Sequence, residues 1–271
     1  LLPPYLRFFR GVVDSEDLPL NVSREMLQEN KNLSAIRRQL TRKAIKVLTE
    51  TASERPEDYE ALWTEFGAVL KEGLHQDGGH RDELIALTRW YSVNTEGLNS
   101  LADYVKTMPE DQPFIYFIAG EHAETLRTSP HLEALKSRGH DVLLMTDAVD
   151  EWVLQSMSEY EGNTFRNVMQ GDLDGDESKG EEADADATPE PSAIDPLLSA
   201  AKTLLGDNVK EVKASTRLTN SAACLVDADG SMSRNMERIM RLARQRVHDT
   251  PRVLELNPTH PLVERANELA Q

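Results

Sequence analysis

Apolar residues in the first hundred positions recur with the period of a helix. Between residues 33 and 48 they fall every three or four positions, while Arg38, Arg42 and Lys46 lie on the opposite face. Such spacing predicts an amphipathic helix. Residues 58–74 and 83–91 show the same period, so we predict a helix-rich block that extends to about Met108.

The hydrophobic period changes after this block. Residues 114–118 and 141–145 are short, continuous apolar runs, which are typical of strands buried on both faces. Helical periods at 122–137 and 150–160 follow the two runs. The alternation predicts a βαβα unit with parallel strands and a right-handed crossover.

The last eighty residues or so mix both periods. Helices are predicted at 194–205, where Gly206 ends the helix, at 231–246 and at 261–269, and strands at 209–216, 222–226 and 252–256. The predicted fold class is therefore α/β and α+β in two domains. A helix-rich block precedes a small αβα sandwich with parallel strands, and a mixed α+β C-terminal domain comes last.

A strongly acidic tract separates the sandwich from the C-terminal part. Residues 171–190 carry nine carboxylates and a single lysine, Lys179. The tract has little apolar surface to bury, and its charges repel one another. We therefore predict a linker and domain boundary at 171–193.

The composition limits the classes of function. There are 30 Lys and Arg against 47 Asp and Glu, a net charge of −17 that opposes binding to nucleic acid or to an anionic membrane. No apolar run approaches the roughly 18 residues of a membrane span. A single cysteine, Cys224, fits a reducing compartment, so a cytoplasmic protein is expected. The chain begins at Leu1 rather than Met and is expected to be a piece of a longer protein.

Self-contained catalytic motifs are missing from the sequence. It contains no G-x-x-x-x-G-K-[ST], no G-x-S-x-G and no H-E-x-x-H. His75 and His80 flank an Asp-Gly-Gly turn, where solvated loop histidines are favoured over a metal pair, and no metal site is predicted. Cys224 lies in a predicted apolar strand and is interpreted as inert packing.

The segment around Arg24 has an unusual arrangement of charge. Ser23 is a plausible N-cap, which places Arg24 in the first turn of a helix and Gln28 one turn later on the same face. A cation there opposes the helix dipole, whereas a helix start together with a guanidinium can hold an anion such as phosphate. The alternative is a surface ion pair between Arg24 and a neighbouring carboxylate. Spacing alone leaves both readings open.

A second informative segment is the predicted helix at 231–246. Its methionines and Ile239 fall on one face and its arginines on the other. Such a stripe is ordinarily core, yet flexible methionine side chains also suit surfaces that accept many partners. The residues that form the apolar face are Met232, Met236, Ile239 and Met240.

The sequence also resembles a known family. Residues 11–28 read G-V-V-D-S-E-D-L-P-L-N-V-S-R-E-M-L-Q and are similar, almost letter for letter, to a stretch of the middle domain of the heat shock protein 90 chaperones. The resemblance continues at 101–105, 115–116, 129–135 and 150–151. Beyond the acidic tract, segments 204–206, 217–219, 227–229 and 255–258 look like the bacterial branch, the HtpG type.

This resemblance implies an ATP-driven, homodimeric chaperone that binds unfolded or partly folded client proteins. Residues 1–50 would end the large α/β part of the middle domain, 51–112 form a helical connector and 113–170 the small αβα part. The acidic linker at 171–193 would lead to a C-terminal domain at 194–271. That domain would lack the last dimerisation helices, so the chain by itself would be able to exist as a monomer.

The resemblance also assigns roles to residues. Arg24 would be the catalytic arginine that reaches the γ-phosphate of ATP in an N-terminal ATPase domain of the same polypeptide, with Gln28 in support. Asn21 and Ser23 would belong to the supporting loop. Client contacts are implied for Trp152 and Gln155, in addition to the apolar face at 232–240. ATP and Mg²⁺ would be bound by the complete protein, whereas this chain is expected to hold no cofactor and to be inactive by itself.

Two alternatives remain beside this interpretation. One is a stand-alone α/β enzyme that acts on a small phosphorylated ligand at the Arg24 anion site. The other is a scaffold whose acidic tract and methionine-rich helix bind basic partners. The first alternative lacks an evident base, nucleophile or metal cluster in the sequence.

Overall fold

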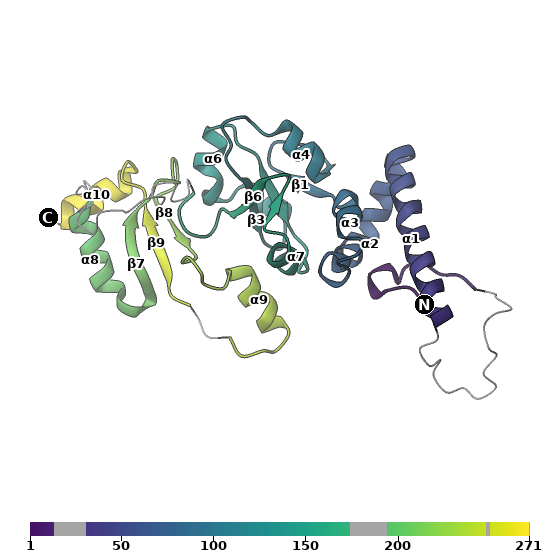
Figure 1. Ribbon diagram of the computed structural model, residues 1–271. Helices are drawn as coiled ribbons and strands as arrows, with labels where there is room; N and C mark the ends of the chain where they lie inside the picture. The colour runs from purple at the N-terminus through teal and green to yellow at the C-terminus, as the bar shows by residue number, and fades with distance from the viewer. Residues whose placement is uncertain (14–30, 174–193, 248–249, 271) are drawn as a thin grey trace, which may run out of the picture. The chain divides into compact units, whose positions relative to one another are not determined.

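The computed structural model describes residues 1–13, 31–173, 194–247 and 250–270 (Figure 1). Contacts within the chain define two compact units. The first comprises Leu1–Trp90, Leu98–Lys106 and Trp152–Met157, and the second comprises Tyr91–Gly97, Thr107–Glu151 and Ser158–Gln271. The division at residues 50, 112, 170 and 193 expected from the sequence is a finer one and stays a prediction.

The first unit is helical, as the sequence predicts. Its elements are the 3-10 turn η1 (Pro4–Leu6), α1 (Lys31–Glu54), α2 (Pro56–Gln76), α3 (Arg81–Leu87), the short strand β2 (Leu98–Asn99) and α4 (Leu101–Thr107). Pro56 occupies the first turn of α2, where its missing N–H costs no hydrogen bond. Apolar residues from α1, α2 and α3, among them Ile45, Leu70 and Leu84, are almost fully buried.

A parallel sheet forms the centre of the second unit. Strand β3 (Ile115–Ala119) pairs in parallel with β4 (Val142–Met145) on one side and with β6 (Asn163–Asn167) on the other. The short strands β1 (Trp90–Ser92) and β5 (Glu159–Tyr160) pair antiparallel with β4 and β6, which gives the order β1-β4-β3-β6-β5. The parallel β3–β4 pair confirms the predicted βαβα unit.

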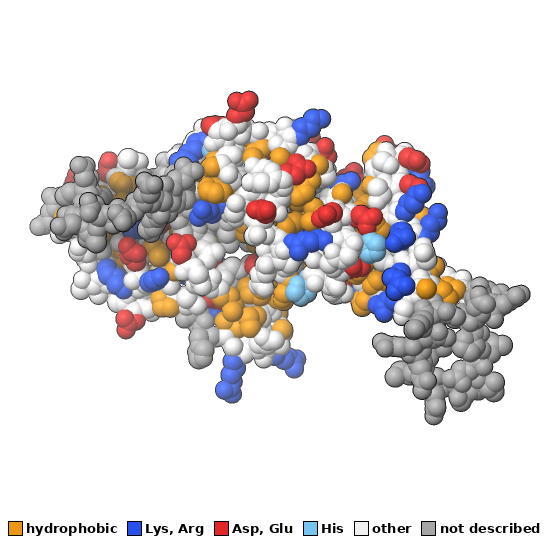
Figure 2. Space-filling view, in the orientation of Figure 1, with side chains coloured by type: hydrophobic (Ala, Val, Ile, Leu, Met, Phe, Trp, Pro, Cys, Tyr) orange, Lys and Arg blue, Asp and Glu red, His pale blue; other side chains and the backbone are white. Residues whose placement is uncertain are grey.

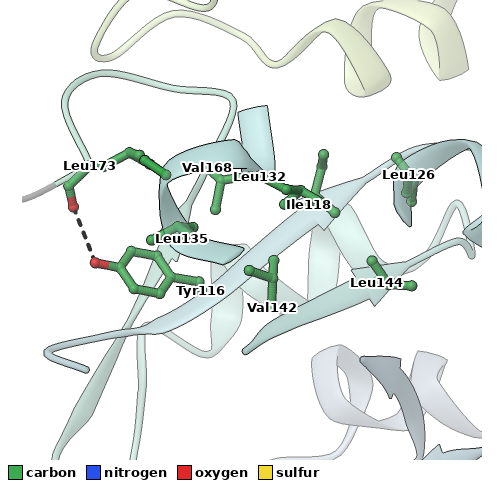
Figure 3. Packing of buried hydrophobic residues seen from close by; sticks show 10 residues of the cluster. Tyr116, Ile118, Leu126, Leu132, Leu135, Val142, Leu144, Val168 and Leu173 are labelled. Carbon is green, nitrogen blue, oxygen red and sulfur yellow. Dashed lines mark hydrogen bonds between the residues drawn. The ribbon is translucent and has the colours of Figure 1, made fainter. Parts of the chain in front are cut away.

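Helical turns complete this layer and its core. They are α5 (Ala123–Arg127), η2 (Pro130–Leu132) and α6 (Glu133–Ser137). Helix α7 (Asp150–Ser156) is divided between the units, with Asp150 and Glu151 in the second and the rest in the first. Figure 3 shows side chains of β3 and β4 packed against Leu132 and Leu135, with the Tyr116 hydroxyl 3.4 Å from the carbonyl oxygen of Leu173. Burial on both faces explains why β3 and β4 read as continuous apolar runs.

A separate three-stranded sheet lies in the C-terminal part of the second unit. Its order is β7-β9-β8, with β9 (Arg252–Leu256) parallel to β7 (Val209–Ala214) and antiparallel to β8 (Ala223–Val226). The accompanying helices are α8 (Asp195–Leu205), η4 (Gly206–Asn208), α9 (Arg234–Leu242) and α10 (Pro261–Ala270). Gly206 has a φ of 53°, which confirms it as the stop of α8.

Three predicted helices are wrong in part. The helix expected at 122–137 is broken into α5, η2 and α6 because Pro130 cannot supply a helical N–H. The helix expected at 83–91 ends at Leu87, and Trp90–Ser92 form β1 instead. The helix expected at 150–160 ends at Ser156. Glu161 and Gly162 then both adopt positive φ, the geometry of a tight hairpin turn, and join β5 to β6.

Helix α9 is also shorter than predicted, since it covers Arg234–Leu242 of the expected 231–246. Arg244 adopts a φ of 58°, a left-handed conformation incompatible with a continuing helix. In the described part of the chain, no helix has the length and apolar character needed to cross a membrane.

Candidate functional site

The start of helix α9 is fixed by two side chains. Ser233 caps it, because its Oγ accepts a hydrogen bond from the backbone N–H of Met236 at 3.0 Å. Asp227 Oδ2 accepts the backbone N–H of Arg234 at 2.9 Å. Both donors would otherwise lack a partner within the first helical turn.

Arg252 on β9 holds this helix against the C-terminal sheet. Its Nε donates to Asp227 Oδ1 at 2.8 Å, and its Nη2 donates to Glu237 Oε2 at 2.7 Å. Burial alone would lower the pKa of Arg252, but the hydrogen bonds to Glu237 and Asp227 outweigh burial and raise it. Both carboxylates are nearly inaccessible to solvent, so their charges depend on this guanidinium.

Two more carboxylates connect α9 to the parallel sheet of the same unit. Glu151, in the first turn of α7, accepts hydrogen bonds from Ser233 Oγ at 2.9 Å and from Asn235 Nδ2 at 3.0 Å. Glu121, which follows β3, accepts from Arg238 Nη1 at 2.5 Å. Helix α9 is therefore held at both its start and its middle.

A groove of about 1150 Å³ lies beside α9, within the second unit. Residues that follow β3, the turn at 128–131 and the edge strand β8 form its other walls. The groove lies at the carboxyl end of β3, where Ile118, Ala119 and Gly120 contribute to its lining. Ligands commonly bind outside the carboxyl ends of parallel strands. Charged residues of the lining are Glu121, Arg234, Glu237, Arg238, Arg241 and Arg252.

The apolar face of α9 is separate from this groove. Met232 is 40% exposed, Ile239 and Met240 are half-buried, and Met236 is buried with 8% of its surface exposed. None of these four is among the described residues that line the groove. Figure 2 shows the apolar side chains gathered over α9. The stripe is thus part core, at Met236, and part accessible surface.

The other residues with an implied client role lie in the first unit. Trp152 and Gln155 are on α7, where Trp152 is 37% exposed and Gln155 is exposed. A partly exposed tryptophan offers a large apolar area at little entropic cost. The first unit therefore presents one partly exposed aromatic side chain, Trp152, and one exposed polar side chain, Gln155, on the same helix.

The residues of the implied ATPase role fall outside the described part. Asn21, Ser23, Arg24 and Gln28 all lie within 14–30. Their assignment therefore stays a prediction.

Sequence reasoning missed a buried charge cluster in the second unit. Arg217 and Glu255 are each 1% exposed, and Arg217 Nε donates to Glu255 Oε2 at 2.9 Å. The same guanidinium donates to the carbonyl oxygens of Val168, at 2.6 Å, and of Gly171. Both residues lie in segments that resemble the family, at 217–219 and 255–258. The resemblance therefore pointed to these positions, but it did not indicate that they form an ion pair.

Glu133 is a second charged group that the sequence did not single out. Its Oε2 accepts the backbone N–H groups of Thr219, Asn220 and Ser221 at 2.7, 2.7 and 3.1 Å, and its Oε1 accepts the Ser221 hydroxyl at 2.5 Å. Burial alone would raise the pKa of Glu133, but these hydrogen bonds lower it to about 2. The carboxylate joins α6 to the loop between β7 and β8.

Other groups with possible chemistry are accounted for by their surroundings. Burial, reinforced by Glu255, raises the pKa of the Cys224 thiol to about 12, which supports its interpretation as inert packing. His80 Nδ1 lies 2.6 Å from Glu83 Oε2. Among the residues that the structure describes, no group of three or more His, Cys, Asp or Glu side chains is placed to hold a metal ion.

Helix α9 thus carries both a partly exposed apolar face and one wall of a charged groove. Comparison with known proteins supplies the family. The family model described as Hsp90 protein matches residues 1–271. The chain therefore belongs to the Hsp90 family.

Similar proteins include the Chaperone protein HtpG of Methylococcus capsulatus, which is 45% identical over 270 residues, covering 98% of this chain and 43% of that protein. The Chaperone protein HtpG of Roseobacter denitrificans is 44% identical over 274 residues, covering 100% of this chain and 44% of that protein. The Geobacter metallireducens protein of the same name is 45% identical over 267 residues, or 97% and 41%. The chain thus spans about two-fifths of the length of these relatives.

Proposed function

We propose that this chain is the client-binding part of an ATP-dependent molecular chaperone and that it supplies an arginine for ATP hydrolysis in the complete protein. Family membership and the name Chaperone protein HtpG of its relatives support the chaperone class. The complete protein would be a cytoplasmic homodimer whose clients are unfolded or partly folded proteins. ATP and Mg²⁺ would be held outside this chain.

The accessible apolar surface of α9 is the observation that carries the client-binding role. The buried carboxylate of Glu237 and the half-buried carboxylate of Glu151 hold the helix through Arg252 and Ser233, so this surface is presented on a fixed support. Met232 and Met240 are unbranched and adaptable, which suits contacts with many apolar sequences. A fixed helix with an adaptable face can bind clients that share no sequence.

Replacement of both accessible methionines tests this role. Met232→Ser with Met240→Ser should weaken suppression of client aggregation several-fold, because it removes apolar surface that a client would cover. Light scattering of a heat-denatured client enzyme, with the 271-residue chain added, measures the effect. Met236 is left intact because its burial makes a serine there destabilising.

Leu204→Ser provides the matched control, because Leu204 is 86% exposed on another helix of the same unit. It should leave suppression unchanged. Unaltered suppression in the double methionine variant, or a large fall in its melting temperature, would contradict a client-binding role for this face.

Arg24 is proposed to act on the nucleotide bound elsewhere in the polypeptide. Bound ATP would supply the phosphoryl group, and the guanidinium would neutralise charge that develops on that group during transfer. Gln28 would orient the guanidinium, and Asn21 and Ser23 would shape the loop. The match of residues 11–28 to the family motif supports these roles.

In the longer protein, Arg24→Ala should therefore suppress ATP turnover by two orders of magnitude or more while ATP affinity stays within about threefold. Steady-state hydrolysis and equilibrium nucleotide binding measure the two quantities. Arg38→Ala is a suitable control, because Arg38 is an exposed arginine on α1. Equal loss of affinity and turnover would refute the assigned role.

The two rival functions make different predictions for the isolated chain. A stand-alone enzyme would turn over a phosphorylated substrate without addition, whereas the chaperone part should hydrolyse ATP only when its N-terminal domain is supplied. A scaffold would do neither. Mixing the chain with that domain and ATP, and measuring released phosphate, separates the three.

A further inference from the structure

Strand β8 has an unpaired edge within the described part of the second unit. It is the outer strand of the order β7-β9-β8. The backbone N–H of Asn257 donates to the carbonyl oxygen of Ala222, so even-numbered residues of β8 face β9. In an antiparallel pair the alternate residues point away from the partner strand. The N–H and C=O groups of Ala223 and Leu225 therefore point outward from the sheet.

The end of the strand confirms this alternation. Asp227 follows β8 directly and is odd-numbered, like Ala223 and Leu225. Its backbone N–H and C=O groups both point away from β9. Its N–H donates to the carbonyl oxygen of Met169 at 2.8 Å, and its C=O accepts the N–H of Gly171 at 3.1 Å. Residues 169–171 thus pair with the edge at Asp227 only. Among the described residues, no hydrogen bond outside the β8–β9 ladder is made by the backbone of Ala223 or Leu225.

The unpaired edge adjoins the groove beside α9. Leu225 is 43% exposed and lines the groove together with Met169 and Leu242. The volume of about 1150 Å³ exceeds what a drug-sized ligand requires, so several residues of an extended chain fit. An exposed edge with outward backbone groups is a template for strand addition.

The charge of the groove is opposite to that of the whole chain. Its lining has four arginines and two glutamates, an excess of two positive charges in a chain of net charge −17. Both glutamates already accept hydrogen bonds from Arg238 and Arg252. Arg241 Nη2 also lies 3.9 Å from Glu237 Oε2. Arg234 and Arg241 are the exposed arginines of the lining, whereas Arg238 and Arg252 are half-buried.

His131, in the lining of the groove, has a ring nitrogen without a hydrogen-bond partner among the described residues. His131 is 7% exposed, and its Nδ1 makes no hydrogen bond in the described structure. Burial, with Arg217 and Arg234 nearby, lowers its pKa to about 4, so the ring is neutral at pH 7. A neutral imidazole in the wall can accept or donate one hydrogen bond to a polar ligand.

We propose that an extended segment of a client polypeptide, with apolar side chains and acidic side chains, adds to the edge of β8 as a further strand. Backbone hydrogen bonds to Ala223 and Leu225 would provide affinity for any sequence. Alternate side chains would enter the groove, where Leu225 and Leu242 favour apolar groups and Arg234 and Arg241 favour carboxylates. The inference rests on the proposed client-binding function and adds a second mode of contact, independent of the methionine face.

Backbone methylation of a probe peptide tests the strand directly and needs no protein variant. The probe is a fluorescein-labelled, twelve-residue peptide that alternates valine with aspartate. One isomer is N-methylated on the valines and the other on the aspartates. Only one set of N–H groups can face β8, so one isomer should bind to the 271-residue chain at least tenfold more weakly, and the other should match the parent peptide in fluorescence anisotropy.

Charge reversal in the groove tests the predicted selectivity. Arg234→Glu should weaken binding of the valine–aspartate peptide several-fold and improve that of a valine–lysine peptide. Arg246→Glu is the matched control, because Arg246 is exposed and lies outside the groove lining, and it should change neither. A single-stranded oligonucleotide that bound as tightly as the acidic peptide would overturn the proposal in favour of a polyanion site.

Three other results would also overturn the proposal. Both methylated isomers could bind with the affinity of the parent peptide, both could lose affinity equally, or the parent peptide could fail to bind. The aggregation assay with Met232→Ser and Met240→Ser is run on the same preparation. If that variant loses suppression while the peptide shows no strand-specific binding, strand addition fails and the proposed function stands. If suppression is unchanged as well, the proposed function fails too.

Discussion

Glu133 shows how one carboxylate can organise a loop. It accepts three consecutive backbone N–H groups and one hydroxyl from residues 219–221, and these hydrogen bonds hold its pKa at about 2. An ordinary glutamate in the unfolded chain titrates near 4.5. The folded state therefore binds this proton less readily than the unfolded state, and the resulting stabilisation is complete only above the unfolded pKa.

A pH series of Glu133→Gln tests this linkage. At pH 7 the variant should have a lower free energy of unfolding than the natural chain, by on the order of 1 kcal/mol, because a neutral amide accepts these N–H groups less strongly. The difference should shrink as the pH falls from about 4.5 toward 2, where the natural carboxyl becomes protonated. Chemical denaturation at several pH values measures it, and a difference that is constant between pH 7 and pH 2.5 would contradict the assignment.

At the scale of elements, close packing overrides helix propensity in α2. Gly73 lies in the last turn of this helix. A Cβ atom at Gly73 would lie 2.8 Å from the Tyr5 ring and 2.9 Å from a methyl of Leu84, both on neighbouring elements. These neighbours are buried, with 0% and 1% of their surface exposed, and have little room to move. The glycine therefore lets η1, α2 and α3 approach one another.

Gly73→Ala should consequently destabilise the first unit by about 1–3 kcal/mol through overpacking, although alanine is the better helix former by up to about 1 kcal/mol. Thermal unfolding followed by circular dichroism measures the change. Ala68→Gly supplies the comparison, because Ala68 is exposed on the same helix and should lose about 1 kcal/mol or less, from propensity alone. A raised melting temperature in Gly73→Ala would show that this contact does not constrain the helices.

Long elements were predictable from the sequence and short ones were not. Clear hydrophobic patterns, with helical spacing in α1 and α2 and continuous apolar runs in β3 and β4, predicted these elements. Strands β1, β2 and β5 have two or three residues, too few to show a period, and exist because a neighbouring strand pairs with them or a turn directs them. The break at Pro130 was visible in the sequence but was outweighed by the apolar period on either side.

Across the whole molecule, the site depended on contacts between distant segments. The apolar face of α9 was predictable from spacing, but Met232 and Met236 share that face, and only the packing of the helix makes one exposed and the other buried. Glu121 and Glu151 lie 117 and 84 residues from their partners Arg238 and Asn235 on α9. Contacts between residues so far apart leave no pattern in the local sequence, so neither the groove nor its charge was predicted.

The second unit contains two sheets, and a buried ion pair lies where they meet. Arg217 donates to the carbonyl oxygens of Val168 and Gly171, which follow β6 of the parallel sheet, and to Glu255 on β9 of the other sheet. Around Glu255, Ser215 Oγ donates at 2.7 Å, and Lys213 Nζ lies 3.6 Å away. Lys213 also donates to Asp172, which follows β6, at 2.6 Å, but Asp172 is exposed, whereas the contacts of Arg217 are buried.

Removal of this guanidinium should therefore affect the unit as a whole. Arg217→Met leaves Glu255 buried without its main counter-ion and two carbonyl oxygens without a donor, which should cost about 3–5 kcal/mol, nearer the lower value because Lys213 remains close. The double variant Arg217→Met with Glu255→Met should recover part of this loss, since it removes the unpaired charge as well. Calorimetry should also show separate transitions for the two sheets in the single variant. A single transition with a loss below 1 kcal/mol would mean that the Lys213 contacts, Glu133 and the pairing of Asp227 with residues 169–171 suffice to couple the sheets.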